Sequence, residues 1–137
     1  MINFNDFFDD SYQFALKELS YENIHNDIDV PNLNLIMSDT INTTVSDKWL
    51  KIVYGRKLTF EPETLYALNV EFEISISFKD SVDPNTIKID WNKELIETEN
   101  PYIANITSRI SHLISAITSS SGQQPVITPP IPMFDDK

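Results

Sequence analysis

Apolar and polar residues alternate most regularly in residues 66–78. The apolar positions of this stretch are Tyr66, Leu68, Val70, Phe72, Ile74, Ile76 and Phe78. A period of two over this length predicts one long β-strand with a buried face and a polar face. Two faces of such different polarity are typical of an antiparallel sheet that is covered on one side, because strands of parallel sheets are apolar throughout.

Shorter stretches on the N-terminal side also predict strands. Residues 12–21 alternate with a slip of one position near residues 17–18, which predicts a strand with a β-bulge or a bend. Residues 30–38 predict a short edge strand, because their proline cannot donate to a sheet ladder. The polar residues 39–47 indicate a loop. Residues 49–54 fit either a brief strand or a turn of helix.

A turn is predicted directly after the long strand. The triplet Asp83-Pro84-Asn85 has the composition of a tight turn, and Ile87, Ile89 and Trp91 then alternate again. This arrangement predicts a β-hairpin.

The period becomes helical from Asn100 onward. Asn100 is suited to cap a helix and Pro101 to occupy its first position. The apolar residues that then share one face are Ile103, Ile106, Ile110, Leu113, Ile114 and Ile117. They predict an amphipathic helix of about five turns that stops near Gly122.

The two ends of the chain show no regular period. Residues 1–11 are mostly polar and acidic around three phenylalanines and predict a short helix or a flexible arm. Residues 123–137 are held extended by their prolines. The chain shows no internal repeat, and its 137 residues predict a single domain, residues 1–137, of the α+β class.

The charge of the chain disfavours several kinds of partner. It carries 21 acidic and 10 basic residues, for a formal net charge of −11. The resulting field repels phosphate backbones and anionic membrane surfaces and favours encounters with basic segments. We therefore expect neither a nucleic-acid partner nor membrane insertion. Glu71 and Glu73 project from the same face of the long strand, which is either a solvated sheet face or a patch for a basic partner.

Residues that usually perform catalysis are scarce. The chain has no cysteine and only two glycines, which excludes thiolate chemistry and a phosphate-binding loop. His25 and His112 lack the neighbours of a metal site or a catalytic triad. We predict a protein without catalytic residues, metal or cofactor that works by binding another polypeptide. The N-terminus lacks the pattern of a signal peptide and no apolar stretch is long enough to span a bilayer, so we expect a cytoplasmic protein.

The C-terminal third resembles the signature of the SecB export chaperones. In NPYIANITSRISHLISAITSSSGQQPVITPPIPMF, the residues at matching positions are Pro101, Tyr102, Ala104, Gly122, Pro125, Pro129 and Phe134. YQFALKELSYEN is similar to the first SecB strand, NLNLIMSD to the second and LYALNVEFEISIS to the long third. The chain departs from the family where a fuller fourth strand should follow, and Met133-Phe134 replaces Asn-Phe.

The resemblance implies a four-stranded antiparallel sheet with helices on one side, assembled as a dimer of dimers. SecB proteins hold unfolded precursors in apolar grooves and deliver them to the ATPase SecA, so the implied partners are an unfolded polypeptide and SecA. By position, Leu33 and Leu35 on the second strand and Met133 and Phe134 on the tail are the groove candidates. A core role for these four side chains stays open.

A second class of function also fits the sequence. The chain could be a structural or assembly subunit, for example one encoded by a virus, whose apolar surface is occupied by its own copies. A chaperone should leave its groove vacant, whereas such a subunit should not.

Overall fold

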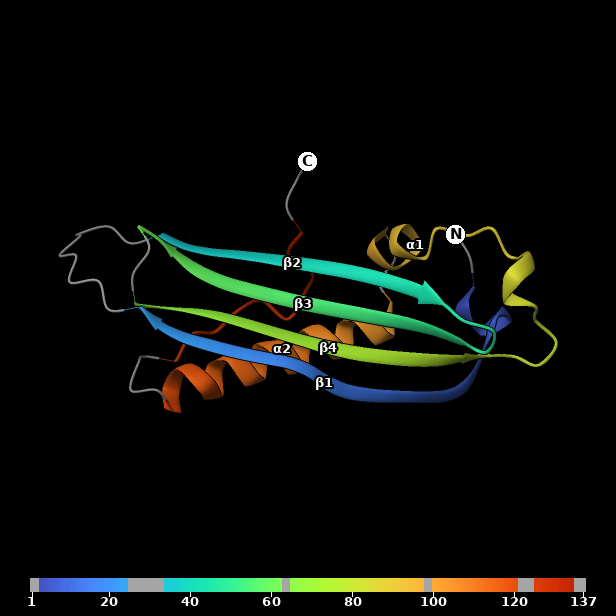
Figure 1. Cartoon of the computed structure of the whole chain (residues 1–137), viewed down its shortest axis with the longest axis horizontal. Coiled ribbons are helices and arrows are strands. Elements are labelled where there is room, and N and C mark those ends of the chain that lie inside the picture. Colours follow the sequence, from blue (N-terminus) through green and yellow to red (C-terminus); the bar gives the residue numbers. More distant parts are fainter. Residues whose placement is uncertain (1–2, 25–33, 63–64, 98–99, 121–124, 135–137) are drawn as a thin grey trace.

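The protein consists of one antiparallel sheet with its helices and C-terminal segment on a single face (Figure 1). The computed structural model describes residues 3–24, 34–62, 65–97, 100–120 and 125–134. The four strands are β1 (Phe8–Ile24), β2 (Asn34–Val45), β3 (Trp49–Glu61) and β4 (Leu65–Phe78), in the order β1-β4-β3-β2. The helices are η1 (Phe4–Asp6), η2 (Pro84–Thr86), α1 (Trp91–Glu97) and α2 (Pro101–Ser120). The predicted α+β fold with four antiparallel strands and a long C-terminal helix is confirmed.

The alternation of residues 66–78 is realised in β4, the central strand with the most regular burial. Its even-numbered residues are buried under α2 and its odd-numbered residues are half-exposed on the opposite face. β3 repeats the pattern, with Leu50, Ile52, Tyr54 and Leu58 buried. The sheet face opposite α2, called the outer face below, is polar and carries Lys51, Lys57, Glu71 and Glu73.

The predicted bulge in the first strand is also present. The register of β1 against β4 shifts between Leu16 and Glu18. Because Leu16 pairs with Phe72 and Leu19 with Val70, both leucines lie on the face that α2 covers. The slip in the sequence thus keeps apolar side chains on one face along the whole of β1.

The loop predicted for residues 39–47 is wrong. β2 continues to Val45, and each of its residues from Asn34 onward pairs with a residue of β3. The threonines and isoleucine of this polar stretch are β-branched and fit a half-buried strand, so the ladder with β3 overrides the turn-like composition.

Residues 49–54, which fitted either a strand or a turn of helix, belong to β3. This strand runs through Gly55, where an added Cβ would lie 3.0 Å from the Cγ atom of Glu71. A glycine therefore lets the two strands pair beneath that side chain. The long strand of residues 66–78 is consequently the fourth and not the third, so the fourth strand that seemed reduced in comparison with SecB is present as β4.

The hairpin predicted after Asp83 is also wrong. Asp83 caps η2, with its carboxylate accepting the N–H of Asn85 at 3.0 Å, and the chain then enters α1 at Trp91. Trp91 is buried and contacts the rings of Phe4, Phe7, Phe8 and Phe78. Packing of this large ring decides the local structure, and it also holds the described N-terminal residues against the core, where they do not form a free arm.

The long helix begins and buries its residues as predicted. The side chain of Asn100 accepts the N–H of Tyr102 at 2.9 Å and caps α2. Ile103, Ile106, Ile110 and Ile114 are buried against the sheet. This helix fixes the position of the segment that follows it.

Candidate functional site

Residues 125–134, called the strap below, return from the C-terminal end of α2 across the sheet toward β2 (Figure 1). The strap contains no helix or strand. It lies on the face of the sheet that also carries α2, and its contacts with β2, β3 and α2 define the candidate site.

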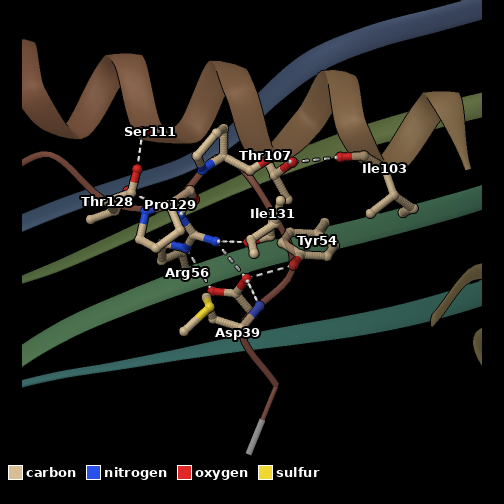
Figure 2. A network of polar contacts seen from close by, with 11 residues as sticks. Asp39, Tyr54, Arg56, Ile103, Thr107, Ser111, Thr128, Pro129 and Ile131 are labelled. Atoms are coloured by element: carbon tan, nitrogen blue, oxygen red, sulfur yellow. Dashed lines mark hydrogen bonds and ion pairs between the residues drawn. The ribbon is translucent and has the colours of Figure 1, made fainter. Parts of the chain in front are cut away.

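A buried arginine on β3 holds the backbone of the strap (Figure 2). The side chain of Arg56 is fully buried. Its Nη1 donates to Thr128 Oγ1 at 2.9 Å and to the carbonyl of Pro129 at 2.7 Å. Its Nη2 donates to the carbonyl of Ile131 at 2.7 Å. Charged donors make strong hydrogen bonds in a buried site, so Arg56 acts as an anchor for the strap.

Asp39 on β2 neutralises this arginine and adds its own bonds to the strap. Its carboxylate accepts from Arg56 Nε at 2.7 Å and from Nη2 at 2.8 Å, which is a bidentate pair. It also accepts the hydroxyl of Tyr54 at 2.5 Å and the N–H of Met133 at 2.9 Å, while the N–H of Asp39 donates to the carbonyl of Met133. Burial, and next the bond to Asp39, raise the pKa of Tyr54 well above its usual range.

Hydroxyl groups of α2 hold the other edge of the strap. Thr107 donates to the carbonyl of Pro130 at 2.8 Å, and Ser111 donates to the carbonyl of Thr128 (Figure 2). Near the end of the helix, Thr118 accepts the N–H of Val126 at 2.9 Å. The strap is thus held through its main chain.

Several side chains of the strap are free to meet a ligand as a result. Ile127 is 84% exposed, Ile131 57% and Met133 36%. Exposed apolar side chains on a segment whose backbone is fixed are typical of a binding surface. The anchoring network was not predicted from the sequence, although Arg56 stands in phase with the buried residues of β3, which is a recognisable signal.

Three of the four predicted groove residues lie on the α2 side of the sheet. Leu35 pairs with Phe60 on the α2 side of β2 and is 43% exposed. Met133 lies on the same side, next to Asp39. Phe134 is partly buried, with its ring 5.7 Å from that of Tyr54. Leu33 lies outside the described residues.

The two predicted acidic candidates lie on the outer face. Glu73 forms an ion pair with Lys51 at 3.2 Å. Glu71 stands between Glu18 of β1 and Gly55 of β3 in the ladder. Their role toward a basic partner stays a prediction.

A hollow of about 570 Å³ lies beside α2. Its lining residues are Phe72, Asn105, Ser108, Arg109, His112, Leu113 and Ala116. Phe72 pairs with Leu16 of the edge strand β1, and Leu16 and Leu19 are each nearly half exposed. Apolar surface is therefore exposed on both sides of α2, along the strap and along β1.

Two further observations concern the described parts of the chain. Within them, no helix is both long and apolar enough to cross a membrane. The same residues contain no cluster of three histidine or acidic side chains that could hold a metal ion.

The fold is similar to that of a solved chaperone. No protein-family model and no curated protein sequence matches the chain. Among solved structures, it is similar to the SecB-like chaperone Rv1957 of Mycobacterium tuberculosis, determined in complex with a ChAD peptide from the Rv1956 HigA1 antitoxin. The TM-score is 0.63 at 11% sequence identity, over 88% of this chain and 87% of that one.

Proposed function

We propose that this protein is a SecB-like molecular chaperone, which holds extended segments of unfolded polypeptides on the α2 side of its sheet. The observation that carries the proposal is the strap, whose backbone is bonded to Arg56, Asp39 and α2 while its apolar side chains face solvent. The similar fold of a chaperone solved with a bound peptide supports it.

The physical basis of binding is burial of apolar surface without catalysis. Client side chains that cover the strap and Leu35 would gain about 25 cal/mol per Å² of apolar area. Because the strap is already fixed by its network, little conformational entropy is lost on its side of the contact. Met133 and Phe134 belong to this surface, and we retain Leu33 as a candidate from its position in the sequence.

Binding of an unfolded client tests the proposal directly. The purified protein should suppress aggregation of a chemically denatured client when added at a stoichiometric ratio, and it should release the client on dilution. A protein that leaves the aggregation of several unrelated clients unchanged is no chaperone of this type.

We further propose that the working form is a homo-oligomer, a dimer of dimers. The edge strand β1 is 17 residues long and exposes Tyr12, Leu16 and Leu19. Long edge strands with apolar side chains tend to pair with another chain. Light scattering at micromolar concentration should give the mass of a tetramer, and a monomeric mass contradicts this part of the proposal.

The exposed β1 edge also favours the second candidate function, that of a structural subunit occupied by its own copies. The two functions differ in whether the strap surface is vacant in the assembled oligomer. An oligomer that binds an unfolded polypeptide reversibly without dissociating is a chaperone, whereas one that binds none supports the structural role.

The chaperone proposal leaves two cellular pathways to be distinguished. We propose a cytoplasmic protein that serves either exported precursors, delivered to SecA, or one dedicated client. The outer face, with Glu71 and Glu73, is the proposed contact for basic segments of such partners. Titration calorimetry with purified SecA separates the two pathways, since a dedicated chaperone should give no binding signal.

A further inference from the structure

The hollow beside α2 differs in charge from the protein as a whole. The chain carries a net charge of −11, yet the titratable residues that line the hollow are Arg109 and His112. Its other lining residues are neutral, and none is a carboxylate. A carboxylate inside the hollow would therefore meet a cation at short range, where pairwise contacts outweigh the mean field of the chain.

Arg109 is positioned to receive such a group. Its Nε donates to Asn105 Oδ1 at 2.8 Å, and its Cζ lies 4.7 Å from the ring centroid of Phe14. These two contacts hold the guanidinium over the ring and reduce the entropy that a new bond would cost. Among the described residues, no carboxylate forms an ion pair with Arg109. The two Nη groups can therefore bind a carboxylate in a bidentate manner.

The apolar part of the hollow lies close to this cation. Phe72 lines the hollow, and its ring centroid lies 5.0 Å from that of Phe14, the ring over which the guanidinium of Arg109 lies. Side chains two residues apart along a strand are separated by about 7 Å. An extended ligand in the hollow would thus place an apolar residue against Phe72 and, at the next side chain on the same face, two residues away, another group at Arg109.

We propose that the hollow selects client segments in which an apolar residue and a carboxylate stand two positions apart. The inference rests on the proposed chaperone function and names the kind of segment that this part of the surface binds. It assigns Arg109 as the residue that determines specificity, with Asn105 and Phe14 as positioning residues. The outer face lies on the opposite side of the sheet and does not contribute.

Three matched peptides test the preference. They share one uncharged sequence with a central leucine. They differ at a single position, two residues from that leucine, where they carry Glu, Gln or Lys. Fluorescence anisotropy at physiological salt should give the tightest binding for the Glu peptide, about fivefold tighter than the Gln peptide, as expected for one partly exposed charge-assisted pair. The Lys peptide should bind most weakly.

Variants of Arg109 identify the residue responsible. Arg109→Gln should make the Glu and Gln peptides bind equally while leaving the affinity for the Gln peptide within twofold, and Arg109→Glu should reverse the order of the Glu and Lys peptides. Lys57→Gln removes the same charge from the exposed outer face and should leave every ratio unchanged. Arg109→Lys retains the charge and should keep the preference for Glu. It is the control for the case in which the other two variants disturb the fold.

The possible results distinguish the inference from the proposed function. If none of the three peptides binds, the chaperone proposal fails. If all three bind the wild-type protein equally, or if Arg109→Gln keeps the preference for Glu, the chaperone proposal stands and the acid preference is overturned. If Arg109→Glu changes the oligomeric mass in light scattering while the peptides are not discriminated, a second copy of the chain covers the hollow and the inference is also overturned.

Discussion

Replacing Arg56 by methionine should detach the strap while leaving the sheet and α2 folded. The substitution removes the donors to the carbonyls of Pro129 and Ile131 and to the hydroxyl of Thr128. It also leaves the carboxylate of Asp39 in a fully buried position without its cation. Both effects destabilise the docked position of the strap.

The magnitude follows from the burial of the pair. Removing one partner of a buried ion pair typically costs about 3–5 kcal/mol, since the remaining charge is not compensated. Two strap carbonyls without donors would add about 1–3 kcal/mol each if they stayed buried, so release of the strap into water is the lower-energy outcome. We expect a loss of about 4 kcal/mol in the free energy of unfolding, together with opening of the strap.

Urea denaturation and hydrogen exchange measure the two parts separately. Denaturation should give the loss of stability, and exchange followed by mass spectrometry should show lost protection at the amides of Val126 and Met133, which bond to Thr118 and Asp39. The control is Lys57→Met, at the next residue but exposed on the outer face, which should change stability by less than about 0.5 kcal/mol.

A double substitution separates the charge effect from the anchoring effect. Asp39→Leu combined with Arg56→Met removes both buried charges and should recover part of the stability, as apolar replacements of buried ion pairs often do. It should not restore protection of the strap, because the carbonyls of Pro129 and Ile131 still lack donors. If Arg56→Met changes stability by less than about 1 kcal/mol with the strap still protected, the assignment of Arg56 as the anchor is wrong.

Three further predictions concern other parts of the molecule. The pKa values of Tyr54 and Tyr66 are raised, chiefly by burial, so the unfolded chain loses these protons first and stability should fall above about pH 10, by at most about 1.4 kcal/mol per pH unit per tyrosine. Tyr54→Phe should reduce that slope in pH-dependent urea titrations, and an unchanged slope would contradict the role of Tyr54. Asn100→Ala removes the cap of α2 and should cost about 1 kcal/mol, and a melting temperature equal to wild type would show that the cap is dispensable. The double variant Leu35→Ser, Met133→Ser should weaken client binding more than tenfold with little change in melting temperature. Each exposed side chain can contribute about 1.5 kcal/mol or more to a contact that the client covers. A variant that unfolds readily, or one that binds client normally, refutes the groove assignment.

Prediction from the sequence succeeded where a single element determined its own pattern. The period of β4 and the helical period after Asn100 each reflect one face packed against a core, so the elements were recognisable without knowledge of their neighbours. The slip at Lys17 predicted the bulge of β1 for the same reason. Of the candidate groove residues, Leu35 and Met133 are exposed on the α2 side of the sheet, and their part in binding stays a prediction.

Prediction failed where pairing with a distant segment decided the structure. Residues 39–45 have the composition of a loop, yet a complete ladder with β3 makes them a strand. Trp91 alternates with Ile87 and Ile89 as in a strand, but its burial among four phenylalanine rings places it at the start of α1. In both cases tertiary packing overrides the local preference.

The sequence by itself determined the one-sided sheet, the amphipathic helix and the extended character of the C-terminal residues, because period, capping residues and prolines act over a few neighbouring positions. Only the tertiary structure decided where the strap lies and which of its side chains face solvent. Arg56 stands 17 residues from Asp39 and 72 from Thr128, and no local pattern specifies that these side chains meet. They are brought together because β2 and β3 pair along their whole length and α2 returns the chain across the same face, where a buried charge must find its partners.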